Sequence, residues 1–497
     1  MMTRVLKLLG RTSSRSYQRS VALAVLALFT GLYAVVIGTL DNWKLALVLL
    51  ILPAFLGVVV LRDAPRVLLS LLLVSLSFSA RFRAPGYGFH PGGAELAIAP
   101  TDFPLFILGL FWLLQLLKRT RITKAWVKPL WWSFILFLAS HVLSVIPASN
   151  RGFALLELLR LLKMALLVLV ISHYLDSRKK ITFAVNILLL TVILQGTLAV
   201  MQSAFHTSLG LDFLGEHPYW AISKEKITIG RAGGTLGHPN VLANFFEVLT
   251  PIALALIFSG TKGRLRLLAY GALLSGIIGT LLAFSRAGWI SLALGLSLVA
   301  FQHRKRLLAT RVVPALLATG LVVGLIALVF QGVIAARLTA FWEGSRLVRV
   351  VTAQTALNML RSNPILGVGA NNYLAVSNAY VEPDLTPGLS RIAAAVVHNV
   401  VLLYGAELGL LGLVSFLLLL LSLVRLARKI VRWSDPFLAS LSAGTLAGIM
   451  ALIAHSMWDW LFRYDPVYTL FWFSVGLLVA AMKILRNDPV RHQNIVR

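Results

Sequence analysis

Three arginines and one histidine stand out in a chain that is otherwise very apolar. Arg231 lies in GRAGGTLGHPNVLAN, Arg286 in AFSRAGWISL, Arg349 in RVVTAQTALNMLRSNPILGVG, and His398 in HNVVLLYGAELGLLG. Guanidinium groups held in water at a membrane face suit an anionic ligand that is itself membrane-bound, such as a lipid diphosphate. Histidine is the usual side chain for moving a proton near neutral pH. The four residues can act together only if the fold brings them to one side of a membrane.

Membrane-spanning helices must position these residues. The chain has 497 residues, of which 58% are hydrophobic and 13% are charged, and its mean hydropathy is +0.85. A soluble domain is about 25% charged, so this composition indicates a polytopic membrane protein. The chain contains no cysteine, which excludes a disulfide framework, a thiol nucleophile and a cysteine metal site.

Fourteen apolar stretches are long enough, or nearly so, to cross a bilayer, for which a helix needs about 20 residues. They lie at about 21–40, 45–61, 67–80, 102–117, 129–146, 154–175, 182–205, 240–259, 266–284, 287–301, 312–331, 398–424, 437–456 and 466–483. The third is short and is compatible with a re-entrant segment. The predicted fold class is therefore an all-α integral membrane protein with about 14 (12–14) transmembrane helices.

The basic residues predict the orientation of these spans. Eight basic segments, from the amino-terminal residues to the carboxyl tail, hold 30 of the 46 Lys and Arg residues, and fourteen spans put all eight on one side. The positive-inside rule makes that side cytoplasmic, so both termini are expected inside. The net charge of +28 is then explained by topology, and no nucleic-acid partner is expected.

The predicted topology divides the chain into five parts. We expect N-terminal transmembrane helices at 1–205, an extracytoplasmic loop at 206–239, central transmembrane helices with cation-bearing turns at 240–331, a large extracytoplasmic loop at 332–397, and C-terminal transmembrane helices with a cytoplasmic tail at 398–497. The large loop is expected to be helical, because Val350, Ala353, Leu357 and Leu360 recur at helical spacing before Asn363-Pro364 ends the pattern.

Each candidate residue lies on the predicted outer face. Pro239 is well placed to begin a span, and the free N–H groups of that helix start favour an anion near Arg231. Arg286 lies in a short outward turn. For Arg231 and Arg286 the alternative is an arginine that contacts lipid headgroups. His398 begins a span, where the helix dipole disfavours its protonated form, so we expect a neutral imidazole; the alternative is a helix cap.

Three acidic residues lie inside apolar stretches: Glu157, Glu247 and Glu407. A carboxylate in a membrane is costly unless it faces the bundle interior and pairs with a histidine or an arginine. We therefore expect interior pairing for all three.

Taken together, these stretches resemble the O-antigen ligase/polymerase superfamily of bacterial envelope enzymes, over about residues 225–480. The resemblance rests on an ordered series of motifs: Arg231 before a Gly-rich turn and Pro-Asn at Asn240, Ser285-Arg286-Ala-Gly288, Arg349 leading to Pro364–Gly369, His398-Asn399, the Glu-x-Gly-x-x-Gly of Glu407, Gly409 and Gly412, and His455 in AHSMWDW. Two features depart from the family. Ala353 stands where the family often has Trp, and the family usually has about twelve spans.

The resemblance implies a GT-C-like membrane glycosyltransferase that needs no metal and no cofactor. Its donor would be a glycan on undecaprenyl diphosphate, and its acceptor a lipid A–core sugar hydroxyl or another glycan, at the periplasmic side of the bacterial inner membrane. His398 would be the catalytic base, and Arg231, Arg286 and Arg349 would bind the diphosphate. The supporting residues would be His238, Asn240, Asn399, Glu407 and His455.

Two other functions remain open from the sequence. An O-antigen or polysaccharide polymerase uses the same donor, and its motifs are similar. A lipid-linked oligosaccharide flippase or a 14-span transporter belongs to a different class, whose members show internal repeats. The ligase is preferred because the His-Asn and Glu-x-Gly-x-x-Gly segments fit it best, and because the chain shows no convincing repeat.

Overall fold

The computed structural model describes residues 63–83, 97–118, 128–224, 227–307, 343–381, 395–432 and 435–487, together with the isolated helical residues 324, 328, 331 and 332. The predicted stretches at 21–40 and 45–61, and nearly all of 312–331, lie outside these residues. Every structural statement below refers to the described part of the chain.

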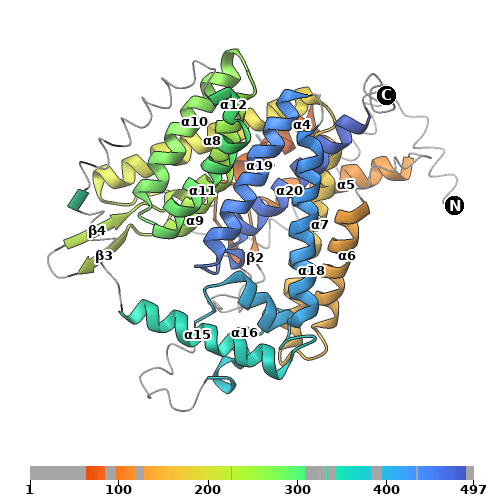
Figure 1. Ribbon diagram of the computed structural model, residues 1–497, viewed down its shortest axis with the longest axis vertical. Helices are drawn as coiled ribbons and strands as arrows, with labels where there is room; N and C mark the ends of the chain where they lie inside the picture. Colours follow the sequence, from red (N-terminus) through yellow and green to blue (C-terminus); the bar gives the residue numbers. More distant parts are fainter. Residues whose placement is uncertain are drawn as a thin grey trace, which may run out of the picture.

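The described residues form mostly helices (Figure 1). These are α4 (Ala64–Ser75), α5 (Asp102–Lys118), α6 (Lys128–Leu143), α7 (Arg151–Tyr174), α8 (Arg178–Phe205), α9 (Pro239–Phe258), α10 (Gly263–Leu282), α11 (Arg286–Gln302), α12 (Arg304–Leu307), α15 (Glu343–Ser362), α16 (Tyr373–Val376), α18 (Val400–Val431), α19 (Pro436–Ser456) and α20 (Asp465–Arg486). Short 3-10 turns are η1 (Asp212–Leu214), η2 (Gly234–Leu236), η3 (Ser377–Ala379) and η5 (Leu461–Arg463). Two antiparallel strand pairs join β1 (Phe82–Arg83) to β2 (Ala97–Ile98) and β3 (Trp220–Lys224) to β4 (Ile227–Arg231).

The helical membrane architecture agrees with the sequence. Six described helices, α8, α9, α10, α18, α19 and α20, are long and apolar enough to cross a membrane. Shorter apolar helices lie in α4, α5, α6 and α11, at predicted stretches. The third predicted stretch corresponds to α4, which has only 12 residues. A total of fourteen spans stays a prediction.

Helix α9 lies at the centre of the bundle. The apolar stretch of α9 that is long enough to cross a membrane is entirely buried. The helix packs against α8, α10, α11 and α19. Close approach to α19 depends on a small residue, because a Cβ added to Gly448 would overlap the backbone of Val248. Small residues at helix interfaces are the usual means of close packing in membranes. The start of α9 is thereby fixed against the other helices that carry candidate residues.

The large predicted loop contains α15 and α16, which lie across one end of the bundle (Figure 1). A helix over 349–361 is confirmed, but the predicted apolar face is wrong at Val350, which is 58% exposed. Val351, Ala356 and Met359 are buried instead, because α15 packs against α18 and that contact determines the inward face.

Helix α18 is interrupted at Gly409, whose φ of 65° is left-handed. The backbone groups around this interruption bond to the turn after α15: the N–H of Val368 donates to Ala406 O at 2.9 Å, and the N–H of Leu410 donates to Pro364 O at 2.7 Å. A Cβ on Gly409 would overlap the carbonyl of Ile365. The Pro364–Gly369 and Glu407–Gly412 motifs are therefore two halves of one structural junction.

Candidate functional site

Hydrogen bonds join the starts of α9 and α18 to the segment 457–464 that lies between α19 and α20, and Arg231 joins Asn240 of α9 to the turn before α11. Asn240 Nδ2 donates to Asp459 Oδ2, Arg231 Nε donates to Ala283 O at 2.9 Å, and Asn399 Nδ2 donates to Met457 O at 3.2 Å. Residues more than 200 positions apart in the sequence thus form one cluster at one end of the bundle.

Arg231, at the end of β4, is buried with 6% exposure. Its Nη2 donates to Asn240 Oδ1 at 2.7 Å, and Asn240 in turn donates to Asp459. Asn240 therefore bridges a guanidinium and a carboxylate. His238 is the N-cap of α9, as the predicted start at Pro239 requires, and its Nδ1 accepts from the N–H of Asn240 at 3.1 Å.

Arg286 is the first residue of α11, and Ser285 caps that helix by accepting from the N–H of Gly288. Arg231 binds the carbonyl of Ala283 in the same turn, so the structure brings Arg231 next to the turn that carries Arg286. On the inner side of this turn, Ser285 Oγ lies 3.5 Å from His455 Nε2. Two of the three predicted cations therefore border one short turn.

His398 lies two residues before the first residue of α18, because Asn399 is the N-cap. Asn399 Oδ1 accepts from the N–H groups of Val401 and Leu402 at 2.9 and 3.0 Å. Burial lowers the pKa of His398, Asp459 opposes this change, and Arg349 adds to it. The expected neutral imidazole is supported, but burial is the main cause, where the sequence suggested the helix dipole.

Arg349 lies on α15, and its side chain is exposed. It is close enough to His398 to influence the pKa of that residue. Convergence of Arg349 with Arg231 and Arg286 on one diphosphate stays a prediction.

Asp459 was not singled out in the sequence, and it lies at the centre of the site. It is 5% exposed. Burial opposes its ionisation, yet His455, His398 and His238, together with the hydrogen bond from Asn240, hold its pKa below the usual value. The acidic residue in AHSMWDW was visible in the sequence, but nothing in the pattern showed that three histidines would surround it.

The interior acids pair as expected. Glu247 Oε1 lies 2.7 Å from His455 Nδ1, and both side chains are fully buried. Glu407 forms an ion pair with Arg463 and accepts from the N–H of Tyr373 at 3.1 Å. Glu157 pairs with Arg160 and Arg463 at 3.3 and 3.5 Å. These buried pairs join α18 to η5 and α19 to α9, and a supporting role for Glu407 and His455 in the site stays a prediction.

The arrangement combines a partly buried histidine, a carboxylate, and basic side chains that differ in exposure. Such a site can bind an anion and accept a proton from a neutral hydroxyl. In the described part of the chain, no group of three or more His, Cys, Asp or Glu side chains is placed to hold a metal ion.

Residues 271–417 match the family model described as O-antigen ligase. The matched region contains Arg286, Arg349, His398 and Glu407, and ends before Asp459. No curated protein matches the chain.

Proposed function

We propose, from the match of residues 271–417 to the O-antigen ligase family model, that the protein is a metal-independent, inverting glycosyltransferase with a GT-C-like fold. Its donor is a glycan on undecaprenyl diphosphate. Its acceptor is a sugar hydroxyl of lipid A–core at the periplasmic face of the inner membrane. The observation that carries the proposal is the cluster in which Asn240 joins Arg231 to Asp459, Arg231 bonds to the turn before α11, and Asn399 bonds to Met457.

In the proposed reaction, an acceptor hydroxyl oxygen attacks the anomeric carbon of the donor sugar, and the hydroxyl proton passes to the neutral imidazole of His398. The bond between that carbon and the diphosphate oxygen breaks, and its electron pair leaves with the diphosphate. Arg231, Arg286 and Arg349 stabilise the negative charge that develops there. Direct displacement inverts the anomeric carbon.

We assign Asp459 a positioning role in this reaction. Its carboxylate interacts with His398 electrostatically, so it stabilises the imidazolium that forms when His398 accepts the proton. The hydrogen bond from Asn240 fixes the carboxylate, and Asn240 also binds Arg231. Asn240 thereby ties the diphosphate-binding side of the site to the proton-accepting side.

Charge changes around His398 should shift the pH profile in opposite directions. A base acts only when unprotonated, so transfer should rise as pH increases through the pKa of His398. Arg349→Gln removes a positive charge that lowers this pKa, and should move the acid limb to higher pH. Asp459→Asn removes a negative charge that raises it, and should move the limb to lower pH. Residual kcat/KM measured against pH tests this, and shifts in the same direction would contradict the assignment.

The proposed orientation can be tested by labelling, because the chain has no cysteine. Asn378, near α16, and Lys429, near the end of α18, are both exposed. In intact spheroplasts, Asn378→Cys should react with a membrane-impermeant thiol reagent, and Lys429→Cys should react only after permeabilisation. The reverse pattern would overturn the topology and the periplasmic site together.

A reconstituted assay without an energy source tests the activity itself. Proteoliposomes with a lipid-linked glycan receive lipid A–core and a lipid-linked repeat unit side by side. Transfer to lipid A–core supports the ligase, and transfer to the repeat unit indicates a polymerase. Movement of the donor across the bilayer without bond formation would reject both enzymes and indicate a transporter.

A further inference from the structure

A large cavity lies at the other end of the helices from the candidate site. It has a volume of about 910 Å³ and is lined by the first residues of α4 and α8, the last turns of α5, α7 and α20, and Trp131 of α6. Helix α20 begins at Asp465, next to the 457–464 segment, and reaches the cavity with Lys483. Its 22 residues span about 33 Å, so the cavity and the candidate site face opposite sides of the membrane.

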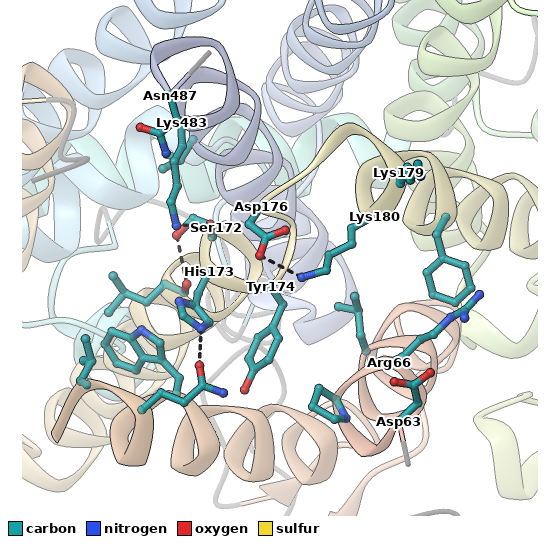
Figure 2. A pocket seen from close by; sticks show the side chains of 18 of the residues that line it. Asp63, Arg66, Ser172, His173, Tyr174, Asp176, Lys179, Lys180, Lys483 and Asn487 are labelled. Carbon is teal, nitrogen blue, oxygen red and sulfur yellow. Dashed lines mark hydrogen bonds and ion pairs between the residues drawn. The ribbon is translucent and has the colours of Figure 1, made fainter. Parts of the chain in front are cut away.

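Basic side chains surround the cavity (Figure 2). Arg66, Lys179, Lys180 and Lys483 line it together with two acidic residues, Asp63 and Asp176. One acid is already paired, since Lys180 Nζ lies 2.8 Å from Asp176 Oδ2. The lining therefore carries a net charge of +2, four positive charges less two negative ones.

Two of the basic residues are available to a ligand. Arg66 and Lys179 are exposed, and within the described residues neither forms an ion pair. Arg66 lies over the ring of Phe183, 4.6 Å from its centre, which holds the guanidinium at the rim. The start of α8, where Ser177 makes no side-chain cap bond, adds free backbone N–H groups beside Lys179.

The rest of the lining includes apolar side chains. Among them are Trp112, Leu116, Trp131, Leu169 and Val479. Tryptophan is typical of the membrane–water interface, where its ring contacts acyl chains and its N–H stays near polar groups. A cationic rim above an apolar wall matches an amphiphile with an anionic headgroup, and basic pockets between membrane helices bind such headgroups.

Two of the segments that the predicted topology assigns to this side of the membrane are basic. The sequence assigns residues 1–20 and 118–128 to this side of the membrane, and they contain ten basic residues and no acidic one. A ligand from outside the chain is the better match for the charge, and about 910 Å³ lies within the range of about 300–1,000 Å³ typical of ligand pockets.

We propose that this cavity binds one anionic phospholipid from the leaflet opposite the candidate site, with its phosphate between Arg66 and Lys179 and an acyl chain along the tryptophan wall. The site is separate from the proposed donor site, and it stands whether or not the protein is a ligase.

Native mass spectrometry of the full-length protein in detergent tests the proposal. Phosphatidylglycerol and phosphatidylcholine with identical acyl chains are the probes. Wild-type protein should retain one phosphatidylglycerol at concentrations where it retains no phosphatidylcholine. Arg66→Gln/Lys179→Gln should weaken phosphatidylglycerol binding by about tenfold or more, because each basic residue near the phosphate contributes to the attraction. Arg66→Lys/Lys179→Arg keeps the charge and should keep most of the binding.

The matched control is Arg428→Gln/Lys429→Gln, which removes two exposed charges from the end of α18, outside the cavity. This variant should bind phosphatidylglycerol like the wild type. Equal loss in both Gln pairs would reveal a general charge effect and overturn the site. Equal retention of phosphatidylcholine, no retention of phosphatidylglycerol, or preference for undecaprenyl phosphate would overturn the proposal as well.

Discussion

Replacing His398 by Gln should lower glycan transfer by about 10²–10⁴-fold, the usual contribution of general-base assistance. The amide keeps a hydrogen-bonding side chain at this position but cannot accept the proton. Donor binding should change little, because the proposed diphosphate contacts come from arginines. Single-turnover transfer and binding of a labelled lipid-linked glycan, measured on the same proteoliposomes, separate the two effects.

His217→Gln is the appropriate control for this variant. His217 is an exposed histidine close enough to influence His238, yet it has no part in the proposed reaction. Transfer by this variant should stay near the wild-type rate. Near wild-type transfer by His398→Gln would mean that His398 only positions the acceptor and that the proton leaves by another route.

Removing the cation on α15 is expected to have the second large effect. Arg349→Ala should reduce kcat by about 10²–10³-fold, the cost of losing one group that stabilises developing negative charge. Arg349 offers a cleaner test than Arg231, because its side chain is exposed whereas Arg231 is buried and hydrogen-bonded to Ala283 and Asn240. Arg349→Lys should remain poor where a two-pronged contact to phosphate oxygens matters.

Arg361→Ala provides the comparison on the same helix. Arg361 is also exposed and lies in the last turn of α15, twelve positions after Arg349. Its loss therefore removes an equal charge from the same helix at a different place. Both variants should show the same thermal unfolding as the wild type. A similar loss of transfer in both would show that α15 contributes only a diffuse potential, and would remove Arg349 from the proposed site.

Local features of the fold were predictable from the sequence. Hydropathy located the apolar helices in the described part, and Pro239 located the start of α9. The interior pairing of Glu157, Glu247 and Glu407 followed from the cost of an isolated carboxylate in a membrane. Each of these inferences depends on the properties of one segment and its immediate surroundings.

Features that depend on tertiary contacts were not predictable in this way. The inward face of α15 differs from the predicted face because α18 selects it. Asp459 lacked a recognisable spacing to His238, His398 or Asn240, since its partners come from helices distant in the sequence. The lowered pKa of His398 was anticipated, but its main cause, burial, depends on neighbours that a single helix does not contain.

The ion pairs of α19, α20 and the segment between them bear on how the chain is made. Glu247 has its partner at His455, 208 positions later, and both Glu157 and Glu407 depend on Arg463. The ribosome makes these partners after Glu247 and Glu407, so the pairings that these two acids make in the folded protein cannot form before α19 and the segment after it have been synthesised. An unpaired buried carboxylate costs several kcal/mol. The 455–463 stretch therefore supplies both the partners of these buried acids and Asp459 of the candidate site.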